Sequence, residues 1–216
     1  MITHLFLIAF LFTFDLFCET VERTKSNIDH WKQAITTPSP WLKSREQLIS
    51  LLPKEAVVAE IGVLRGDFSS QILELTKPEH LFLIDCWDLC DFFEAGLSDY
   101  QLVVSKFDNN PKVSIIKNTS SEAAKNFPDN YFDWVYIDAN HSYDAVKNDL
   151  ETWFPKVKNG GFISGHDYFV PGTPGTPNYY SYLVVPAVNE FVAKYNLEIT
   201  YLTNEPIASY AIQIRK

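Results

Sequence analysis

The sequence is poor in basic residues, in cysteine and in long apolar runs. Its 18 Lys and Arg residues stand against 27 Asp and Glu, a net charge of −9. Nucleic-acid backbones favour basic surfaces, so we expect no nucleic-acid partner. Three cysteines are an odd number and do not make a disulfide framework. The length of 216 residues and the ordinary apolar fraction of 46% instead predict one globular domain with a sizeable core.

The first 20 residues predict a targeting or anchoring segment. Residues 5–14 form an apolar run that Asp15 ends, too short for a comfortable membrane span but suited to the core of a signal peptide. No Lys or Arg precedes the run. We therefore expect residues 1–20 to be a signal peptide, or a membrane tether that acts through residues 5–14. With a genuine leader the protein would be exported or tethered, and otherwise cytoplasmic.

The rest of the chain alternates between strand and helix patterns. Residues 21–53 have helix patterns, including a capping-box sequence from Ser44 to Gln47. Residues 54–216 predict strands at 56–61, 80–85, 113–117, 132–138, 162–165, 198–202 and 208–215, and helices at 67–75, 100–107, 121–127, 143–157 and 183–195. Asn159, Gly160 and Gly161 are expected to stop the helix at 143–157. This alternation is typical of an α/β, Rossmann-like, doubly wound and mainly parallel sheet with helices on both faces.

The last two predicted strands, at 198–202 and 208–215, are close in the sequence, which suggests an antiparallel addition at the sheet edge. Between them and the main alternation, residues 169–180 are rich in Pro and Gly, which predicts a loop. Tyr179, Tyr180 and Tyr182 would let this loop cover a substrate, although its composition fits a bland loop equally well.

A glycine motif lies where the first strand of the alternation meets its helix. The stretch V-V-A-E-I-G-V-L-R-G at 57–66 contains Glu60, Gly62 and Gly66. Glycines at such a junction let backbone amides approach a ligand closely, though a tight turn without a ligand would look the same. The spacing differs from the dinucleotide pattern G-x-G-x-x-G, which disfavours a nicotinamide-dependent oxidoreductase. Asp85 ends the next strand, where a carboxylate suits the hydroxyls of a ribose.

Acidic and imidazole side chains follow two later strands. Asp138 and His141 come after the strand at 132–138, and His166 and Asp167 come after the strand at 162–165. Neighbouring parallel strands would bring these four residues into one small volume. Such a group can bind a divalent cation, or it can hold a histidine as a general base. Taken singly, each residue could equally be a helix cap or a turn former.

These motifs together resemble a class I S-adenosylmethionine-dependent methyltransferase. The resemblance rests on V-A-E-I-G-V-L-R-G-D-F-S, on L-F-L-I-D-C-W-D, and on I-D-x-x-H-x-Y followed by a helix, G-G and H-D-Y. It covers residues 51–168 and is nearest to the macrocin O-methyltransferase-like subgroup. The family implies a seven-stranded sheet whose last strand is antiparallel.

The resemblance also implies site residues. Glu60, Gly62 and Gly66 would hold the methionine end of S-adenosylmethionine, Asp85 its ribose, and Ser120 would lie near its adenine. Macrocin-type relatives bind magnesium with acids after these two later strands, here Asp138 and Asp167. Such relatives often have two acids after the strand that corresponds to 162–165. This chain has His166 and then Asp167 at that place. Magnesium, a softer divalent metal held also by His166, and a metal-free histidine base all stay open.

The expected reaction is therefore methylation of a small-molecule hydroxyl, sugar-like or other. Asp138, His141 and His166 are the candidate catalytic residues, with one of the two histidines removing the acceptor's proton. The alternative is a non-catalytic binding or envelope-associated protein on the same scaffold, which the leader favours because S-adenosylmethionine is made in the cytosol. The acceptor and any homo-oligomer stay open.

Overall fold

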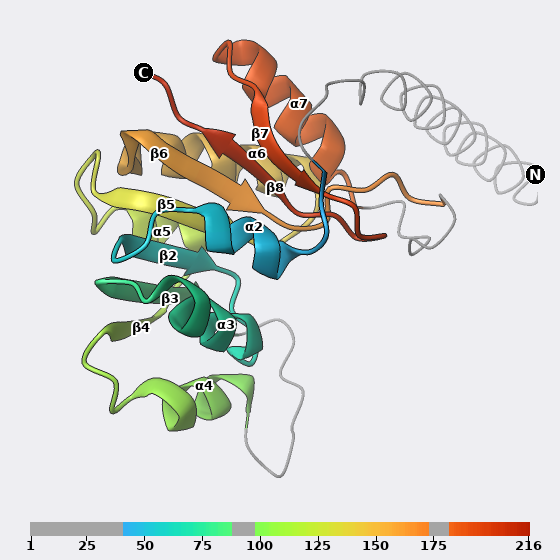
Figure 1. Ribbon diagram of the computed structural model, residues 1–216. Helices are drawn as coiled ribbons and strands as arrows, with labels where there is room; N and C mark the ends of the chain where they lie inside the picture. The colour runs from blue at the N-terminus through green and yellow to red at the C-terminus, as the bar shows by residue number, and fades with distance from the viewer. Residues whose placement is uncertain (1–40, 88–97, 173–181) are drawn as a thin grey trace, which may run out of the picture. The chain divides into compact units, whose positions relative to one another are not determined.

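The computed structural model describes residues 41–87, 98–172 and 182–216, which form a sheet flanked by helices (Figure 1). The sheet has eight strands in the order β1-β7-β8-β6-β5-β2-β3-β4. They are β1 (Trp41–Leu42), β2 (Val57–Ile61), β3 (His80–Asp85), β4 (Val113–Lys117), β5 (Phe132–Ile137), β6 (Val157–Gly165), β7 (Ile199–Thr203) and β8 (Tyr210–Gln213). All neighbouring strands are parallel except β8, which is antiparallel to both β6 and β7.

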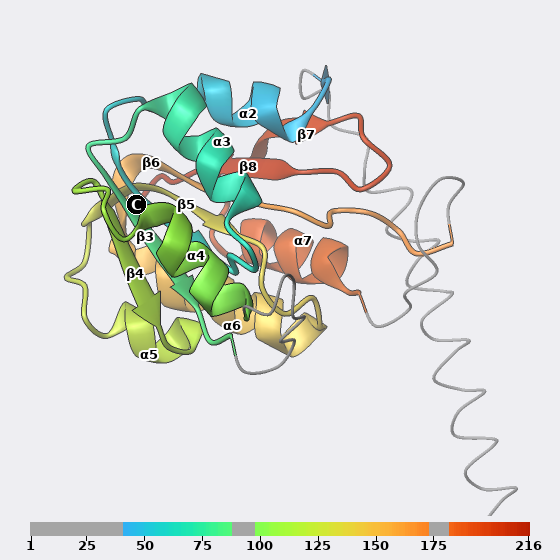
Figure 2. The ribbon, with the colours of Figure 1, turned by 90° about the horizontal axis from the view of Figure 1, so that it is seen from below.

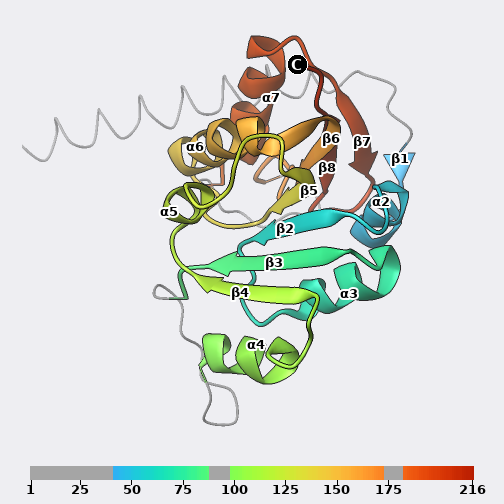
Figure 3. The same cartoon turned by 90° about the vertical axis from the view of Figure 1, so that its left-hand side faces the viewer.

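Helices cover both faces of the sheet. They are α2 (Arg45–Leu51), α3 (Asp67–Thr76), α4 (Asp99–Phe107), α5 (Ser120–Ala124), α6 (Tyr143–Trp153), α7 (Val184–Lys194) and the short 3₁₀ turn η1 (Phe154–Lys156). Figures 2 and 3 show α2, α3 and α4 on one face of the sheet and α5, α6 and α7 on the other. The predicted α/β, doubly wound, mainly parallel architecture is confirmed.

The tail of the chain differs from the prediction in two ways. The last strand, β8, does not extend the edge but is inserted between β6 and β7. The two-residue strand β1 pairs with the outer side of β7 and makes an eighth strand. The sequence could not indicate β1, because two residues are too few to show an alternating pattern.

The predicted helix at 143–157 is shorter in the structure. Helix α6 ends at Trp153, η1 follows through Pro155, and β6 begins at Val157. Proline explains the early end, because its ring and missing N–H favour the first turn of a new segment over the interior of a helix. The pair Gly160 and Gly161 therefore lies inside β6 and does not stop the helix.

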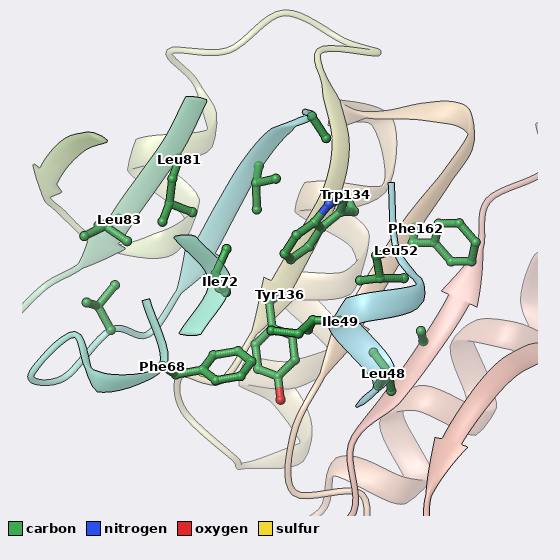
Figure 4. Close-up of a cluster of buried hydrophobic side chains, with 14 of the residues drawn as sticks. Leu48, Ile49, Leu52, Phe68, Ile72, Leu81, Leu83, Trp134, Tyr136 and Phe162 are labelled. Atoms are coloured by element: carbon green, nitrogen blue, oxygen red, sulfur yellow. The ribbon is translucent and has the colours of Figure 1, made fainter. Parts of the chain in front are cut away.

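One large hydrophobic core lies between the sheet and the helices α2, α3 and α4. Figure 4 shows Leu48 and Ile49 of α2, and Leu52 directly after it, pointing at side chains of the sheet, among them Trp134 and Tyr136. Helix α2, predicted to precede the main sheet, thus packs directly on it. This packing is what fixes the first turn of α2 in space.

Some predictions fall on residues that the structure does not describe. The leader at 1–20, its apolar run at 5–14 and the first part of the segment 21–53 lie outside the described residues, as do Tyr179 and Tyr180. Among the residues described, no helix has the length and apolar character needed to span a membrane.

Candidate functional site

The carboxyl ends of the parallel strands gather most of the predicted site residues at one edge of the sheet. Strands β2, β3, β5 and β6 are neighbours and run in one direction. Asp85 therefore lies at the same edge as Asp138, which follows β5, and as His166 and Asp167, which follow β6. Ligands of open α/β sheets bind at this edge, where the loops diverge.

The glycine loop between β2 and α3 packs tightly against the residue that follows β5. Gly62 has a φ of +88°, and a Cβ atom built on it would lie 2.0 Å from the carbonyl oxygen of Asp138. Only glycine allows both this backbone conformation and this contact. Gly66, with a φ of +74°, precedes the first turn of α3, and a Cβ there would meet Phe107 of α4. Both predicted glycines are thus required by the shape of the loop.

Asp85 holds the glycine loop from the end of β3. Its Oδ2 accepts hydrogen bonds from the amides of Val63 and Leu64, at 2.7 and 3.0 Å. Its Oδ1 accepts from the amide of Trp87 at 2.9 Å, and the indole Nε1 of Trp87 donates to the carbonyl of Leu64 at 2.8 Å. A carboxylate oxygen has two lone pairs, so Oδ1 can accept one further hydrogen bond. Trp87 is a support of this loop that the sequence pattern did not single out.

Left-handed backbone conformations occur at this edge as well as at other described positions. Leu64, Trp87 and Asp167 are non-glycine residues with φ between +50° and +57°. A left-handed conformation costs free energy in such residues and persists only where the surrounding contacts enforce it. These three residues follow different strands, β2, β3 and β6, at the edge of the candidate site.

Glu60 is buried beneath the glycine loop. Only 2% of the residue is exposed, and one carboxylate oxygen accepts a hydrogen bond from Ser69 Oγ of α3. Burial raises the pKa of Glu60 to about 8, despite this hydrogen bond. At neutral pH the carboxyl is therefore mostly protonated in the ligand-free protein.

Ser120 differs from the other predicted cofactor contacts, because its hydroxyl already has two partners. It donates to Asp149 Oδ1 at 2.6 Å and accepts from Trp153 Nε1 at 2.9 Å, both on α6. Asp149 is itself buried, and burial raises its pKa to about 6. The hydroxyl thus ties α5 to α6. A contact of Ser120 with a ligand stays a prediction. Because the hydroxyl has these partners, the backbone of Ser120 would make that contact.

The four acidic and imidazole residues meet as expected. His141 Nε2 lies 2.9 Å from Asp167 Oδ2 and 3.3 Å from Asp138 Oδ1. His166 Nδ1 lies 3.2 Å from Asp167 Oδ2 and 3.8 Å from Asp138 Oδ2. Strands β5 and β6 are parallel neighbours, as predicted, and this pairing brings the residues together. We call these four residues the acid–histidine cluster.

Two members of the cluster have shifted pKa values. Burial by itself lowers the pKa of His141, but the hydrogen bonds to Asp138 and Asp167 outweigh it and raise the pKa to about 9. Burial would raise the pKa of Asp167, yet the two histidines hold it well below its usual range. In the ligand-free protein at neutral pH, His141 is therefore a protonated donor to the ionised carboxylate of Asp167.

A divalent metal fits part of the cluster. One ligand atom each from Asp138, His141 and Asp167 lie within 4.8 Å of one another. The sequence had suggested His166 as the third ligand, whereas this grouping contains His141. Two carboxylates with an imidazole suit a borderline cation such as Mn²⁺, Fe²⁺ or Zn²⁺ at least as well as Mg²⁺, which prefers oxygen alone.

An aromatic ring closes one side of the cluster. The ring of Tyr182 stacks on that of His141, with 4.3 Å between centroids and 23° between planes. The amide of Leu183 donates to the carbonyl oxygen of His141 at 2.9 Å, and Phe169 lies 6.0 Å from Tyr182 between centroids. The segments after β6 and before α7 thus reach the cluster. That Tyr182 helps to cover a substrate stays a prediction.

Sequence comparisons place this arrangement among known proteins. A family model described as a methyltransferase domain matches residues 59–168. An uncharacterized protein, R132, of Acanthamoeba polyphaga mimivirus is 30% identical over 156 residues, which are 68% of this chain. The chain spans 65% of the length of that relative.

Solved structures resemble the fold at low sequence identity. An O-methyltransferase family protein from Burkholderia thailandensis has a TM-score of 0.59 at 14% identity, over 80% of this chain and 55% of its own. A Streptococcus mutans protein assigned as a methyltransferase, in complex with SAH, has a TM-score of 0.57 at 12% identity, over 78% and 94%. A Staphylococcus aureus protein assigned as a caffeoyl-CoA O-methyltransferase has a TM-score of 0.54 at 17% identity, over 89% and 99%. At such identities the likeness extends to the fold alone.

Proposed function

Because the chain belongs to the methyltransferase domain family, we propose that it transfers the methyl group of S-adenosylmethionine to a hydroxyl of a small-molecule acceptor. The acceptor is sugar-like or another hydroxylated compound. The finer assignment to the macrocin O-methyltransferase-like subgroup is part of this proposal. The net charge of −9 favours a small molecule over a nucleic acid as the partner.

The observation that carries the proposal is the contact between the glycine loop and the acid–histidine cluster. Gly62 packs on the backbone of Asp138, and the amide of Asp138 donates to the carbonyl of Ile61 at 2.7 Å. A ligand on the loop and a hydroxyl at the cluster would therefore be neighbours. Methyl transfer needs this proximity, because donor carbon and acceptor oxygen must be aligned in a dry site.

The residues of the loop would bind and orient the cofactor. Bound S-adenosylmethionine supplies an activated methyl group on a sulfonium centre. The backbone at Gly62 and Gly66 leaves room for close approach, and Asp85 keeps one acceptor position on Oδ1 for a ribose hydroxyl. Glu60, buried beneath the loop, would lie near the methionine end, where its carboxyl could pair with an ammonium group.

The cluster would remove the acceptor's proton. His141 already holds a proton at neutral pH, so we assign proton acceptance to His166, with Asp138 and Asp167 orienting both rings through the contacts described above. Asp138, Asp167 and one of the two histidines would hold a divalent metal if one is used. The chemistry that such a metal supplies is a lower pKa for the acceptor hydroxyl.

Binding and turnover together test the proposal. The full chain is titrated with S-adenosylmethionine by calorimetry and then incubated with a panel of sugar, phenol and other hydroxylated acceptors. S-adenosylhomocysteine is measured by mass spectrometry. We expect binding, and acceptor-dependent product that falls at least about 100-fold in His166→Gln. Asn204→Gln, a change outside the cluster, is the control. Binding without turnover on any acceptor would favour the non-catalytic alternative, and a folded protein that does not bind would refute the proposal.

A further inference from the structure

Helix α2 begins at the same edge of the sheet as the candidate site. Strand β1 runs parallel to β7, with Leu42 paired to Thr203. Strand β7 is antiparallel to β8, and β8 is antiparallel to β6, so β1 points in the direction of β6. The chain therefore leaves β1 at the carboxyl edge, where Ser44 caps α2. The first turn of α2 borders the site although it lies outside the glycine and acid–histidine motifs.

Arg45 occupies this first turn and lies over a ring of α3, the helix that follows the glycine loop. Its Cζ lies 4.4 Å from the ring centroid of Phe68, the second residue after Gly66. The ring of Phe68 is in turn 4.4 Å from that of Tyr136 between centroids, and Figure 4 shows these two rings side by side next to α2. Tyr136 is the cross-strand partner of Glu60. The guanidinium thus lies close to the part of the site where the amino-acid end of the cofactor is expected.

Electrostatics agree with this placement. Burial is the main cause of the raised pKa of Glu60, and the positive charge of Arg45 acts against it. The neighbouring Glu46 is also influenced by the charge of His166, after larger effects from Ser44 and from burial. The first turn of α2 is therefore within electrostatic range of both the glycine loop and the acid–histidine cluster.

The guanidinium of Arg45 keeps most of its hydrogen-bonding capacity. Across the described ranges, the one carboxylate within 4.0 Å is that of Glu46, whose Oε1 is 3.8 Å from Nε. That separation is too long for a hydrogen bond. The side chain is 28% exposed, so a ligand can reach it. Its planar group of N–H donors matches a carboxylate in a two-point contact, and stacking on Phe68 holds its plane.

We propose that Arg45 binds the α-carboxylate of S-adenosylmethionine and selects for cofactors that carry it. The inference rests on the proposed function, since it concerns the same cofactor. The amino-acid end would then be recognised by two separate parts of the chain, with Glu60 near the ammonium group and Arg45 on the carboxylate. Because α2 is anchored by buried leucine and isoleucine side chains, the guanidinium is positioned before the ligand arrives.

Matched ligands that differ only in this carboxylate test the inference. The full chain and Arg45→Gln are titrated by calorimetry with S-adenosylmethionine and with decarboxylated S-adenosylmethionine. A charge-assisted contact of this kind corresponds to about a 10- to 100-fold change in affinity. We expect the wild type to prefer the intact cofactor by this factor, and Arg45→Gln to lose that preference while its affinity for the decarboxylated compound changes less than about twofold.

Two further variants make the outcome decisive. Arg45→Lys keeps the charge without the planar fork and should give intermediate affinity. Arg215→Gln removes an exposed arginine that follows β8 at the opposite edge and should change nothing. Equal losses for both ligands in Arg45→Gln, or no loss, would overturn the inference while leaving the proposed function intact. Failure of the folded wild type to bind either compound would refute both.

Discussion

The buried carboxyl of Glu60 makes the stability of the protein depend on pH in a defined direction. In an unfolded chain the group has a pKa of 4.5, and burial in the folded state raises it to about 8. Between these values the folded protein binds more protons at this site than the unfolded chain. The stabilisation of the folded state by proton binding at Glu60 is therefore fully present below pH 4.5, and it is lost as the pH rises toward 8.

The size of the effect follows from the same two pKa values. Each pH unit between them is worth about 1.4 kcal/mol, so raising the pH from 5 to 7 should remove about 2–3 kcal/mol of unfolding free energy. The residue is only 2% exposed, so solvent screening reduces this change in unfolding free energy only slightly. Glu60→Gln keeps the size of the side chain and an acceptor for Ser69 Oγ, but it does not titrate.

Urea unfolding, followed by tryptophan fluorescence between pH 5 and pH 8, measures the effect. The unfolding free energy of the wild type minus that of Glu60→Gln should fall by about 2–3 kcal/mol from pH 5 to pH 7, and the variant should be the more stable protein at pH 8. Subtraction removes the titration of all other groups. Glu74→Gln, on an exposed position of the same α3, is the matched control. A difference that stays constant with pH would show that Glu60 is not buried as described.

Three further predictions concern the loop, α5 and the cluster. Gly62→Ala should lower the unfolding free energy by about 2–4 kcal/mol in urea titrations, because the new methyl group would meet the carbonyl of Asp138 at a positive φ. Ser120→Ala should cost about 1–3 kcal/mol by removing a partner of buried Asp149 and of Trp153. It should change cofactor affinity less than about twofold, and a larger loss would show a direct contact. Mn²⁺ should bind the wild type and bind Asp138→Asn at least about 10-fold more weakly by calorimetry, whereas equal affinities would exclude the cluster as the metal site.

The local sequence was sufficient to predict most helices and strands. It was also sufficient to predict which residues meet in the acid–histidine cluster. Strand β3 and strand β4 have the predicted bounds, since apolar runs flanked by turn residues define them without help from the rest of the chain. The position of Asp138 and Asp167 at strand ends was enough to bring them together, because parallel neighbouring strands end at one edge. Gly62 and Gly66 likewise marked the loop correctly.

The tertiary structure decided what each of these side chains is bonded to. Asp85 looked available for a ligand, yet it also supports the loop through three amides. Ser120 looked like a ligand contact, yet its hydroxyl faces α6. Hydrogen-bond partners come from residues distant in sequence, so no local pattern can show whether a polar group already has them.

The sequence by itself thus determined the order of strands and helices, the mainly parallel sheet and the edge at which the site lies, because these follow from local periodicity and from the geometry of parallel strands. Only the tertiary structure decided that β8 enters between β6 and β7 and that Arg45 lies over the ring of Phe68 in α3. The first depends on the pairing of β8 with β6 and the second on the contact of Arg45 with Phe68, and both join segments that are distant in the sequence. Such packing is set by the shape of the whole core, which no short stretch of sequence encodes.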